Sequence, residues 1–255
     1  MTVRIERHGP VVTVTIDRPE RRNAVDEATA RALDEAFDAF EADDEALAAV
    51  LTGAGGAFCA GYDLKAFSEK GADYDPQAGG PMGPTRRMLS KPVIAAVEGP
   101  AVAGGLELAL WCDLRVASTT AVFGVFCRRW GVPLIDGGTV RLPRVVGHGR
   151  ALDMILTGRA VAADEAMAMG LANRLCDEGQ ALATAQALAA EIARFPQLCL
   201  RTDRRSSYDQ LGLPLDEALR HEALLGVEPV AQGARDGAGR FANGAGRGGR
   251  FDAPA

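Results

Sequence analysis

The chain has 255 residues, of which 47% are hydrophobic and 24% are charged. This length and composition allow one large globular domain, or one domain with an appendage, and enough apolar residues for a substantial core. The formal net charge of −6 argues against a general nucleic-acid surface, so we expect no nucleic-acid partner.

The predicted elements of the first half alternate between strands and helices. In chain order they are a hairpin of strands at 3–6 and 11–17, a polar loop at 18–24, an amphipathic helix at 26–43, a buried strand at 48–52, a tight turn into a short helix at 57–65, and a Gly- and Pro-rich stretch at 71–84. The last of these is predicted to be a mobile surface loop.

The stretch at 91–113 organises the middle of the chain. It predicts a buried strand at 92–97, a turn broken by Gly99-Pro100, and an apolar helix that opens at Gly104-Gly105. Adjacent glycines at a helix start let another molecule approach bare backbone, where free N–H groups favour an anion. Glu107 is the one carboxylate in this helix and a candidate for proton chemistry. Its apolar neighbours favour a raised pKa and the helix start favours a lowered one, so the sequence leaves the direction open.

The second half becomes progressively helical. Its predicted elements are short strands at 114–117 and 122–124, a turn-rich stretch at 130–139, helices at 150–156 and 163–169, an alanine-rich helix at 180–195, helices at 197–210 and 215–225, and a Gly- and Arg-rich tail at 233–255. We therefore predict an α/β body over residues 1–195 and a C-terminal helical region with its tail over 196–255.

Features of other protein classes are missing from the sequence. The five cysteines form no C-x-x-C pair and no histidine lies in metal-like spacing, which predicts reduced thiols and no metal site. The N-terminus lacks the apolar core of a secretory signal, and charges and glycines interrupt the longest apolar run, at 92–112. We expect a soluble cytoplasmic protein with no membrane partner.

Common catalytic and nucleotide-binding motifs are also missing. The glycines at 53–56 lack the third glycine of a dinucleotide fingerprint, and no P-loop or G-x-S-x-G sequence occurs. His8, His148 and His221 are isolated in sequence, and we interpret them as structural or surface residues.

One design occurs twice. Ala60-Gly61-Tyr62 and Ala103-Gly104-Gly105 each follow a buried strand and each open a helix. Taken alone, these segments fit two ordinary glycine turns as well as they fit a pair of anion-binding helix entrances.

Three blocks carry a family resemblance: AFCAGYDLK at 57–65, KPVIAAVEGPAVAGGLELALWCD at 91–113 and GGTVRLPRVVG at 137–147. In order and spacing they resemble the crotonase family, the enoyl-CoA hydratase/isomerase superfamily, over about residues 3–241. The resemblance implies an α/β fold in which repeated ββα units wind into a superhelix, followed by a C-terminal helical region. It also implies homotrimers or dimers of trimers.

The resemblance further implies that the backbone N–H groups of Tyr62 and Gly104 bind the thioester carbonyl of an acyl-CoA. Preorganised backbone donors suit an oxygen that becomes negative as an enolate forms. RPERRNA at 18–24 resembles the segment beside the coenzyme A nucleotide, with Arg21 or Arg22 near the phosphates. Coenzyme A is expected as part of the substrate, with no permanently bound cofactor. The residues expected along the substrate and coenzyme A path are Arg22, Ala24, Ala60, Asp63, Leu64, Lys65, Gly105, Cys127, Trp130 and Phe241.

The expected chemistry depends on carboxylates. Hydration of a 2-enoyl thioester needs a base for water and an acid for the α-carbon. The first of the two family glutamates falls on Glu107, but the second falls on Cys127, a poor substitute for a carboxylate. Asp136 lies in the turn that crosses this pocket in the family, and we predict that it replaces the second carboxylate.

The leading functional hypothesis is an enoyl-CoA hydratase of fatty acid metabolism, with Glu107 and Asp136 as the pair that transfers protons. Isomerisation of a 3-enoyl to a 2-enoyl thioester is the close alternative. Decarboxylation or C–C cleavage also suits an oxyanion hole, and Cys127 keeps open a CoA-thioester binder with little turnover.

Overall fold

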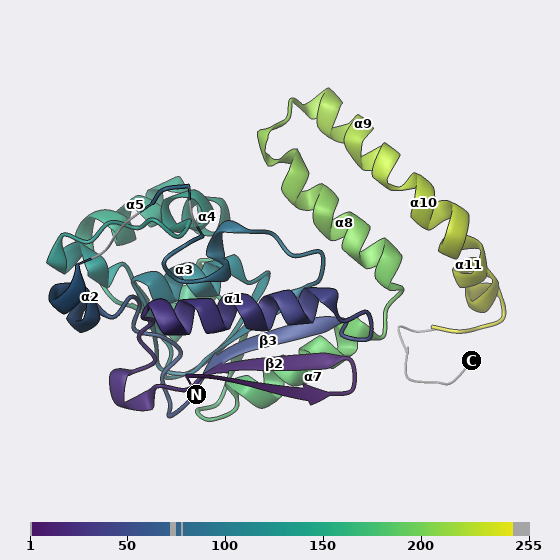
Figure 1. Ribbon diagram of the computed structural model, residues 1–255. Coiled ribbons are helices and arrows are strands. Elements are labelled where there is room, and N and C mark those ends of the chain that lie inside the picture. Colours follow the sequence, from purple (N-terminus) through teal and green to yellow (C-terminus); the bar gives the residue numbers. More distant parts are fainter. Residues whose placement is uncertain (1, 72–74, 78, 247–255) are drawn as a thin grey trace. The chain divides into compact units, whose positions relative to one another are not determined.

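The computed structural model describes residues 2–71, 75–77 and 79–246 (Figure 1). It divides into two units, Met1–Ala193 and Arg194–Ala255. The first unit contains a six-stranded sheet with strand order β1-β2-β3-β4-β6-β9 and a three-stranded sheet with strand order β5-β7-β8.

Parallel pairing dominates the larger sheet. Its strands are β1 (Val3–His8), β2 (Val11–Ile16), β3 (Ala48–Gly53), β4 (Val93–Val97), β6 (Leu114–Ser118) and β9 (Arg174–Cys176). β1 and β2 form the predicted antiparallel hairpin, and every later pair in this sheet is parallel. Parallel neighbours need long crossover connections, and most of the helices of this unit lie in them.

The helices of the first unit are α1 (Glu27–Ala42), α2 (Leu64–Lys70), α3 (Gly104–Trp111), α4 (Gly138–Val146), α5 (His148–Thr157), α6 (Ala163–Ala168) and α7 (Ala181–Ala193). α1 begins where the sequence predicts, because the Asp26 carboxylate accepts a 2.9 Å hydrogen bond from the Thr29 N–H and caps the helix.

Both faces of the central strands β2, β3 and β4 of the larger sheet are buried. In β3, Leu51 packs in the same apolar cluster as Phe37 and Phe40 of α1, whereas Val50 packs with α7. Figure 1 shows α1 and α7 on opposite sides of β2 and β3. α7 meets the sheet through a stripe of small residues spaced four apart, which allows a close approach: Ala181, Ala185 and Ala189. Burial on both faces explains the nearly continuous apolar runs of these strands.

The smaller sheet includes β5, the short strand between β4 and helix α3. Its strands are β5 (Pro100–Val102), β7 (Val122–Gly124) and β8 (Val161–Ala162). The turn predicted at Gly99-Pro100 is confined to Gly99, which has φ +53° and whose Cα faces the Gly56 carbonyl; Pro100 already begins β5. Helix α3 begins at Gly104, as predicted.

The prediction of a surface loop at 71–84 is wrong for its second part. Gly80 and residues 82–84 are buried, and Met82 is only 1% exposed. A composition rich in glycine and proline indicates the backbone conformation of a segment but not its exposure. Here the glycines let the chain pack closely against α1, because a Cβ at Gly83 would lie only 2.8 Å from the Ala30 carbonyl oxygen. Residues 72–74 and 78 lie outside the described part of the chain.

Helix α4 was not predicted. It starts inside the stretch expected to be turn-rich and contains Pro143, a residue that normally ends a helical pattern. Its N-cap is Gly137 at φ +97°, and a Cβ there would lie 2.0 Å from Nη1 of Arg141. The glycine pair at 137–138 therefore starts a helix whose sequence reads as a turn.

The second unit is helical. It consists of α8 (Gln197–Asp209), α9 (Leu215–Leu225), α10 (Val227–Pro229), a π-helical turn at Val230–Ala234 and α11 (Arg235–Ala242). The first part of the Gly- and Arg-rich tail at 233–255 is therefore helical, as far as Ala242. Residues 247–255 lie outside the described part of the chain. Within the described ranges, no helix is both long enough and apolar enough to cross a membrane.

Candidate active site

The two glycine-marked helix entrances lie against each other. The chain segments before them pair in parallel: the Cys59 N–H donates to the Pro100 carbonyl at 2.9 Å, and the Val102 N–H donates to the Cys59 carbonyl at 3.1 Å. A Cβ built on Gly61 would lie 2.9 Å from the Gly104 nitrogen. The structure therefore places the start of α3 directly beside the residue that precedes Tyr62.

Within the described part of the chain, the N–H groups of Tyr62 and Gly104 take no part in the hydrogen bonds of the fold. On its other edge, the 61–63 segment pairs with Val25, which donates to the Gly61 carbonyl and accepts from the Asp63 N–H, each at 2.8 Å. In a parallel bridge of this kind the Tyr62 N–H points away from Val25. Among the described residues, no acceptor bonds to the N–H of Tyr62 or of Gly104.

Backbone strain marks the second entrance. Ala103, the residue before α3, has φ 53° and ψ −125°, a region that only glycine occupies readily. Such a conformation in a non-glycine residue costs on the order of 1–3 kcal/mol and persists where surrounding structure enforces it. Here the Ala103 N–H is held by the Gly124 carbonyl at 2.8 Å, and the turn at Ala103 directs the chain so that Gly104 begins the helix.

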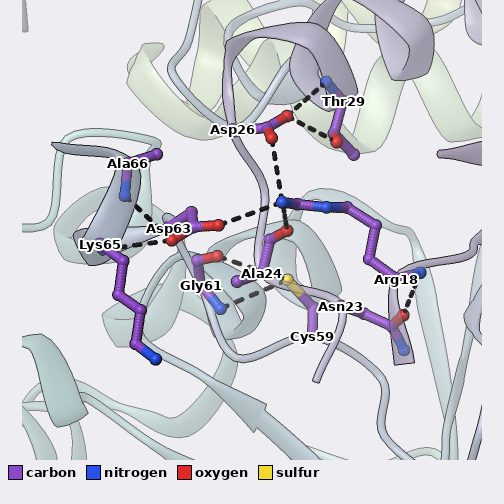
Figure 2. Close-up of polar contacts among 10 residues, drawn as sticks. All are labelled: Arg18, Asn23, Ala24, Asp26, Thr29, Cys59, Gly61, Asp63, Lys65 and Ala66. Carbon is purple, nitrogen blue, oxygen red and sulfur yellow. Dashed lines mark hydrogen bonds and ion pairs between the residues drawn. The ribbon is translucent and has the colours of Figure 1, made fainter. Parts of the chain in front are cut away.

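Arg18 connects the first entrance to two helices (Figure 2). Its guanidinium pairs with Asp26 at 3.0 Å and with Asp63 at 3.1 Å, and it donates to the Ala24 carbonyl. Asp26 caps α1, and the Asp63 carboxylate caps α2 by accepting from the Lys65 and Ala66 N–H groups. One largely buried cation thus fixes both helix starts around the Tyr62 backbone.

Asn23 links the segment that contains Arg18 to the turn at residues 54–57. It has φ 56°, and its side-chain amide donates to the Ala54 and Ala57 carbonyls at 2.8 and 2.6 Å while accepting from the Arg18 N–H at 2.9 Å. Asparagine tolerates this left-handed conformation better than most residues.

A cavity of about 760 Å³ is lined by both Tyr62 and Gly104. Its volume is within the usual range of small-molecule sites. Its wall is mainly apolar, with Glu107 and Asp136 among the polar groups. The apolar and aromatic lining residues are Ala30, Ala60, Tyr62, Leu64, Phe67, Pro81, Met82, Ala103, Phe126, Trp130, Val132, Pro133 and Ile135, beside Cys127.

Glu107 extends from the first turn of α3 into this cavity. Its Oε1 accepts hydrogen bonds from the Asp136 and Gly138 N–H groups, both at 2.8 Å. Burial raises the pKa of this carboxyl to about 7, and the negative charge of Asp136 adds to the rise, while the two N–H donors oppose it. Burial therefore prevails over the N–H donors, and the pKa of Glu107 moves upward, a direction that the sequence left open.

Asp136 meets Glu107 at the same cavity. Its Oδ1 accepts from the Thr85 hydroxyl at 2.5 Å and from the Met82 N–H at 3.1 Å. Burial raises the pKa of the Asp136 carboxyl, against the lowering effect of the Thr85 hydrogen bond. Among the described residues no partner bonds Oε2 of Glu107 or Oδ2 of Asp136, so each carboxyl has one oxygen fixed by two donors and one left over.

Cys127 also lines the cavity, in a 3-10 turn at Phe126–Trp130. Its side chain is buried, and burial followed by the negative charge of Glu107 raises the pKa of the thiol. A neutral thiol in this position neither activates water nor supplies an acidic proton readily.

The residues expected along the coenzyme A path fall into three groups. Ala60, Leu64, Cys127 and Trp130 line the cavity, and Trp130 is 71% exposed. The remaining predicted residues of the first unit, Arg22, Ala24, Asp63, Lys65 and Gly105, do not line it. Phe241 belongs to the second unit, on α11, where it is exposed.

Two of the non-lining residues have clear structural roles instead. The Asp63 carboxylate is bound to Arg18 and to the start of α2. A Cβ at Gly105 would lie 2.1 Å from the Cys59 carbonyl oxygen, so only glycine lets the two entrances pack together. Lys65 is exposed, and Figure 2 shows its side chain directed away from the Arg18 cluster.

Sequence reasoning missed the residues that hold the carboxylates. Thr85 and Met82 lie in or beside the stretch expected to be a surface loop, and Arg141 donates to the carbonyls of both Asp136 and Thr85. The buried pair of Arg18 with Asp63 was missed too, because its members are 45 positions apart. No local pattern signals such contacts.

Comparison with known proteins gives consistent relatives. A family model described as enoyl-CoA hydratase/isomerase matches residues 6–244. The chain is 38% identical over 246 residues to enoyl-CoA hydratase EchA19 of Mycobacterium tuberculosis, covering 93% of this chain and 92% of that protein. It is 36% identical to a carnitinyl-CoA dehydratase of Salmonella arizonae, covering 86% and 85%.

Solved structures agree. A crystal structure of an enoyl-CoA hydratase from Mycobacterium tuberculosis superposes with a TM-score of 0.89 at 38% identity, covering 95% of this chain and 96% of that one. The enoyl-CoA hydratase EchA1 of Mycobacterium marinum gives a TM-score of 0.88 at 37% identity, with the same coverage of both chains.

Proposed function

The chain belongs to the enoyl-CoA hydratase/isomerase family, the crotonase superfamily, and from that premise we propose that it hydrates a 2-enoyl-CoA thioester. The α/β fold with a C-terminal helical region and an activity of hydratase/isomerase type, both expected from the sequence, are confirmed by these relatives.

One observation supports the proposal most strongly. The unbonded N–H groups of Tyr62 and Gly104 and the unbonded oxygens of Glu107 and Asp136 belong to residues that line one cavity. Two backbone donors that need no rearrangement suit a thioester oxygen that gains negative charge. Two carboxyl groups at the same cavity suit the removal and delivery of protons at the adjacent carbons.

In the proposed reaction Asp136 is the base and Glu107 is the acid. The Asp136 carboxylate takes a proton from water as the water oxygen bonds to C3, and the electron pair of the C2–C3 double bond moves onto the thioester oxygen as an enolate. The N–H groups of Tyr62 and Gly104 hold that oxygen. Glu107 then donates its proton to C2, and exchange with solvent returns the proton from Asp136 to Glu107.

The electrostatic surroundings favour this division of roles. Glu107, with a pKa of about 7, carries a proton in a large share of molecules at neutral pH. Burial also raises the pKa of Asp136. Four groups oppose this rise by favouring the charged form of the carboxyl: the Thr85 hydroxyl, the Met82 N–H, and the nearby Arg86 and Arg141. Paired carboxyls whose surroundings differ in this way commonly divide into acid and base.

Isomerisation of a 3-enoyl-CoA is the second candidate. The observation that favours it is the replacement of the family's second glutamate by Cys127, which leaves the second carboxyl on the turn at Asp136 instead. Asp136 would take a proton from C2, the same N–H groups would hold the dienolate oxygen, and Glu107 would protonate C4.

The coenzyme A part of the substrate is proposed to pass Ala60 and Leu64, which line the cavity. Its phosphates are proposed to meet two exposed cations: Lys65, next to Leu64 in the chain, and Arg22, whose carbonyl accepts a 3.0 Å hydrogen bond from the Ala60 N–H. Ala24, Asp63 and Gly105 are proposed to shape this path through their backbone and packing. We propose no permanently bound cofactor.

We also propose a homotrimer or a dimer of trimers in the cytoplasm, with a place in fatty acid metabolism. Several large apolar side chains of the second unit are exposed in the single chain, among them Leu215, Leu224 and Val230. Sedimentation velocity tests the assembly: a monomer at micromolar concentration contradicts it.

The test of function compares crotonyl-CoA and a 3-enoyl-CoA as substrates for the wild type, Glu107→Gln and Asp136→Asn. Each substitution is expected to lower kcat by roughly 10²–10⁴, the usual contribution of a general acid or base. Asp113→Asn is the matched control, because Asp113 follows the same helix α3 but binds the Val93 N–H away from the cavity. Full activity in both active-site variants removes the mechanism, and tight binding of acetyl-CoA without turnover by the wild type favours a binding protein.

A further inference from the structure

The Asp136 side chain is held by Thr85, which the proposed mechanism uses only for its effect on the charge of Asp136. Thr85 lies in a 3-10 turn at Pro84–Arg86 and is 1% exposed, and Asp136 is 2% exposed. The hydroxyl of Thr85 lies 2.5 Å from Oδ1 of Asp136. An ionised carboxylate can only accept a hydrogen bond, so the hydroxyl proton points to Asp136.

The two residues are fixed relative to each other through their backbones as well. Arg141 donates from Nη2 to the Thr85 carbonyl at 2.6 Å and from Nη1 to the Asp136 carbonyl at 3.0 Å. One guanidinium thus joins the 3-10 turn to the turn that carries Asp136. The side-chain hydrogen bond is formed within a frame that already sets the distance between the two residues.

Glycine closes the remaining side of this contact. A Cβ on Gly80 would lie 2.3 Å from Oδ1 of Asp136 and 2.3 Å from Oγ1 of Thr85. The backbone at Gly80 therefore packs directly on the hydrogen bond, and no other side chain fits there. Close packing of this kind leaves no room for a water molecule to replace the hydroxyl at that point.

The Met82 N–H occupies the second acceptor position of the same oxygen, at 3.1 Å. Oδ1 is then fully committed to the protein, and Oδ2 is the atom that can meet a substrate. Charge-assisted bonds to a buried carboxylate are short and directional, so they restrict rotation of the carboxyl group.

We infer that Thr85 is a positioning residue for Asp136: its hydroxyl holds Oδ1, leaves Oδ2 facing the cavity as the atom that takes the proton, and stabilises the ionised base. The inference rests on the proposed function, in which Asp136 is the base. The direction of the pKa effect agrees, because the Thr85 hydrogen bond is the largest influence that lowers the pKa of Asp136 against burial.

The test uses the full-length protein and two substitutions at Thr85. Thr85→Val keeps the shape and removes the hydroxyl, and Thr85→Ser keeps the hydroxyl. For Thr85→Val we expect kcat to fall by about 10- to 100-fold with KM changed less than about 3-fold, because misplacement of a reacting group acts on the chemical step. We also expect the acid limb of the kcat–pH profile to move upward by about one pH unit, since the charged form of Asp136 loses a donor. Thr85→Ser is expected to restore both.

Thr52→Val is the matched control. Its hydroxyl is buried and donates to the Ala96 carbonyl at 3.0 Å, in strands away from the cavity. It should cost comparable stability and leave kcat and the acid limb unchanged. If Thr85→Val does not fold, Thr85→Ala is measured in its place, because the alanine side chain is smaller.

The outcomes separate this inference from the proposed function. If Asp136→Asn is inactive while Thr85→Val has the wild-type kcat and acid limb, the role of Thr85 is wrong and the proposed base stands. If Asp136→Asn is fully active, the proposed base itself is wrong. A Thr85→Ser variant as impaired as Thr85→Val, or a Thr52→Val variant with the same shifted limb, also contradicts the inference.

Discussion

The backbone N–H of Asp136 donates a 2.8 Å hydrogen bond to Oε1 of Glu107. The residue that supplies one carboxyl group to the cavity therefore also orients the other, and the two cannot move independently. A substitution that shifts the backbone at Asp136 should disturb both carboxyls, whereas Asp136→Asn should leave the Glu107 contact in place.

The first prediction concerns pH and Glu107. The folded-state pKa of about 7 lies above the ordinary value of 4.5, so the folded protein holds this proton more tightly than the unfolded chain. The resulting stabilisation is fully present below pH 4.5 and is lost as the pH rises through about 7, an effect of roughly 3 kcal/mol at most. Glu107→Gln keeps an acceptor for both N–H donors and should lack this dependence.

Thermal unfolding between pH 4.5 and 8 measures this dependence of stability on the protonation of Glu107. The difference in Tm between Glu107→Gln and the wild type should move in favour of the variant as the pH rises, and a constant difference contradicts the raised pKa. In the wild type, the rate of hydration should also fall above about pH 7, as the acid loses its proton.

The second prediction concerns Gly61. Alanine there would bring a Cβ within 2.9 Å of the Gly104 nitrogen at a φ of +98°. We expect kcat/KM to fall by about 10²–10³, the usual effect of losing one oxyanion donor. Gly9→Ala is the control, because Gly9 also has positive φ (+58°) but nothing within 4 Å. Equal activity in the two variants would show that the contact between the entrances does not matter for catalysis.

The third prediction concerns Arg18. Replacing it with Met leaves the Asp63 carboxylate buried without its cation, which typically costs about 3–5 kcal/mol. The start of α2 and the Tyr62 backbone should loosen, so that KM rises as stability falls. Arg4→Met, at an exposed pair with Asp17, should cost less than about 1 kcal/mol. In the double variant with Asp63→Asn, much of the loss should be recovered; purely additive losses would count against a direct pair.

The fourth prediction concerns Cys127. If Asp136 is the second proton-transferring group, Cys127→Ala should keep kcat within about 5-fold of the wild type, because the neutral thiol contributes no acid or base. The cost should appear as stability, since a small buried group is removed. A loss of roughly 10²-fold or more, with unchanged Tm, would assign the chemistry to the thiol.

The fifth prediction concerns the C-terminal unit. We expect Phe241 to contact bound acyl-CoA. Phe241→Ala should therefore raise the Kd for acetyl-CoA several-fold, because burial of an aromatic ring contributes strongly to binding. The side chain is 70% exposed in the single chain, so folding should be unaffected. Leu156→Ala, at a position also 70% exposed but on α5 of the first unit, is the control. Calorimetry that gives the same Kd for Phe241→Ala and the wild type contradicts this role.

Much of the fold followed from local patterns. The hairpin, α1, β3, β4 and α3 lie where the alternation of apolar residues, the Asp26 cap and the glycines at 104–105 predict them. These signals are local because strand and helix periodicity and capping depend on neighbours within a few residues. Helix α4 escaped prediction because its glycines and Pro143 imitate a turn, and only packing of its apolar residues, such as Leu142, supports the helix.

The candidate groups could be named from the chain's local patterns: two glycine-marked helix entrances, Glu107 and Asp136. How these groups are arranged and charged depends on contacts between distant segments. Thr85 reaches Asp136 across 51 positions, and Glu107 meets the Asp136 N–H across 29. Burial, which raises the pKa of both carboxyls, comes from segments brought together by the whole fold. Desolvation and hydrogen bonding act through space, so no local pattern in the chain can encode them.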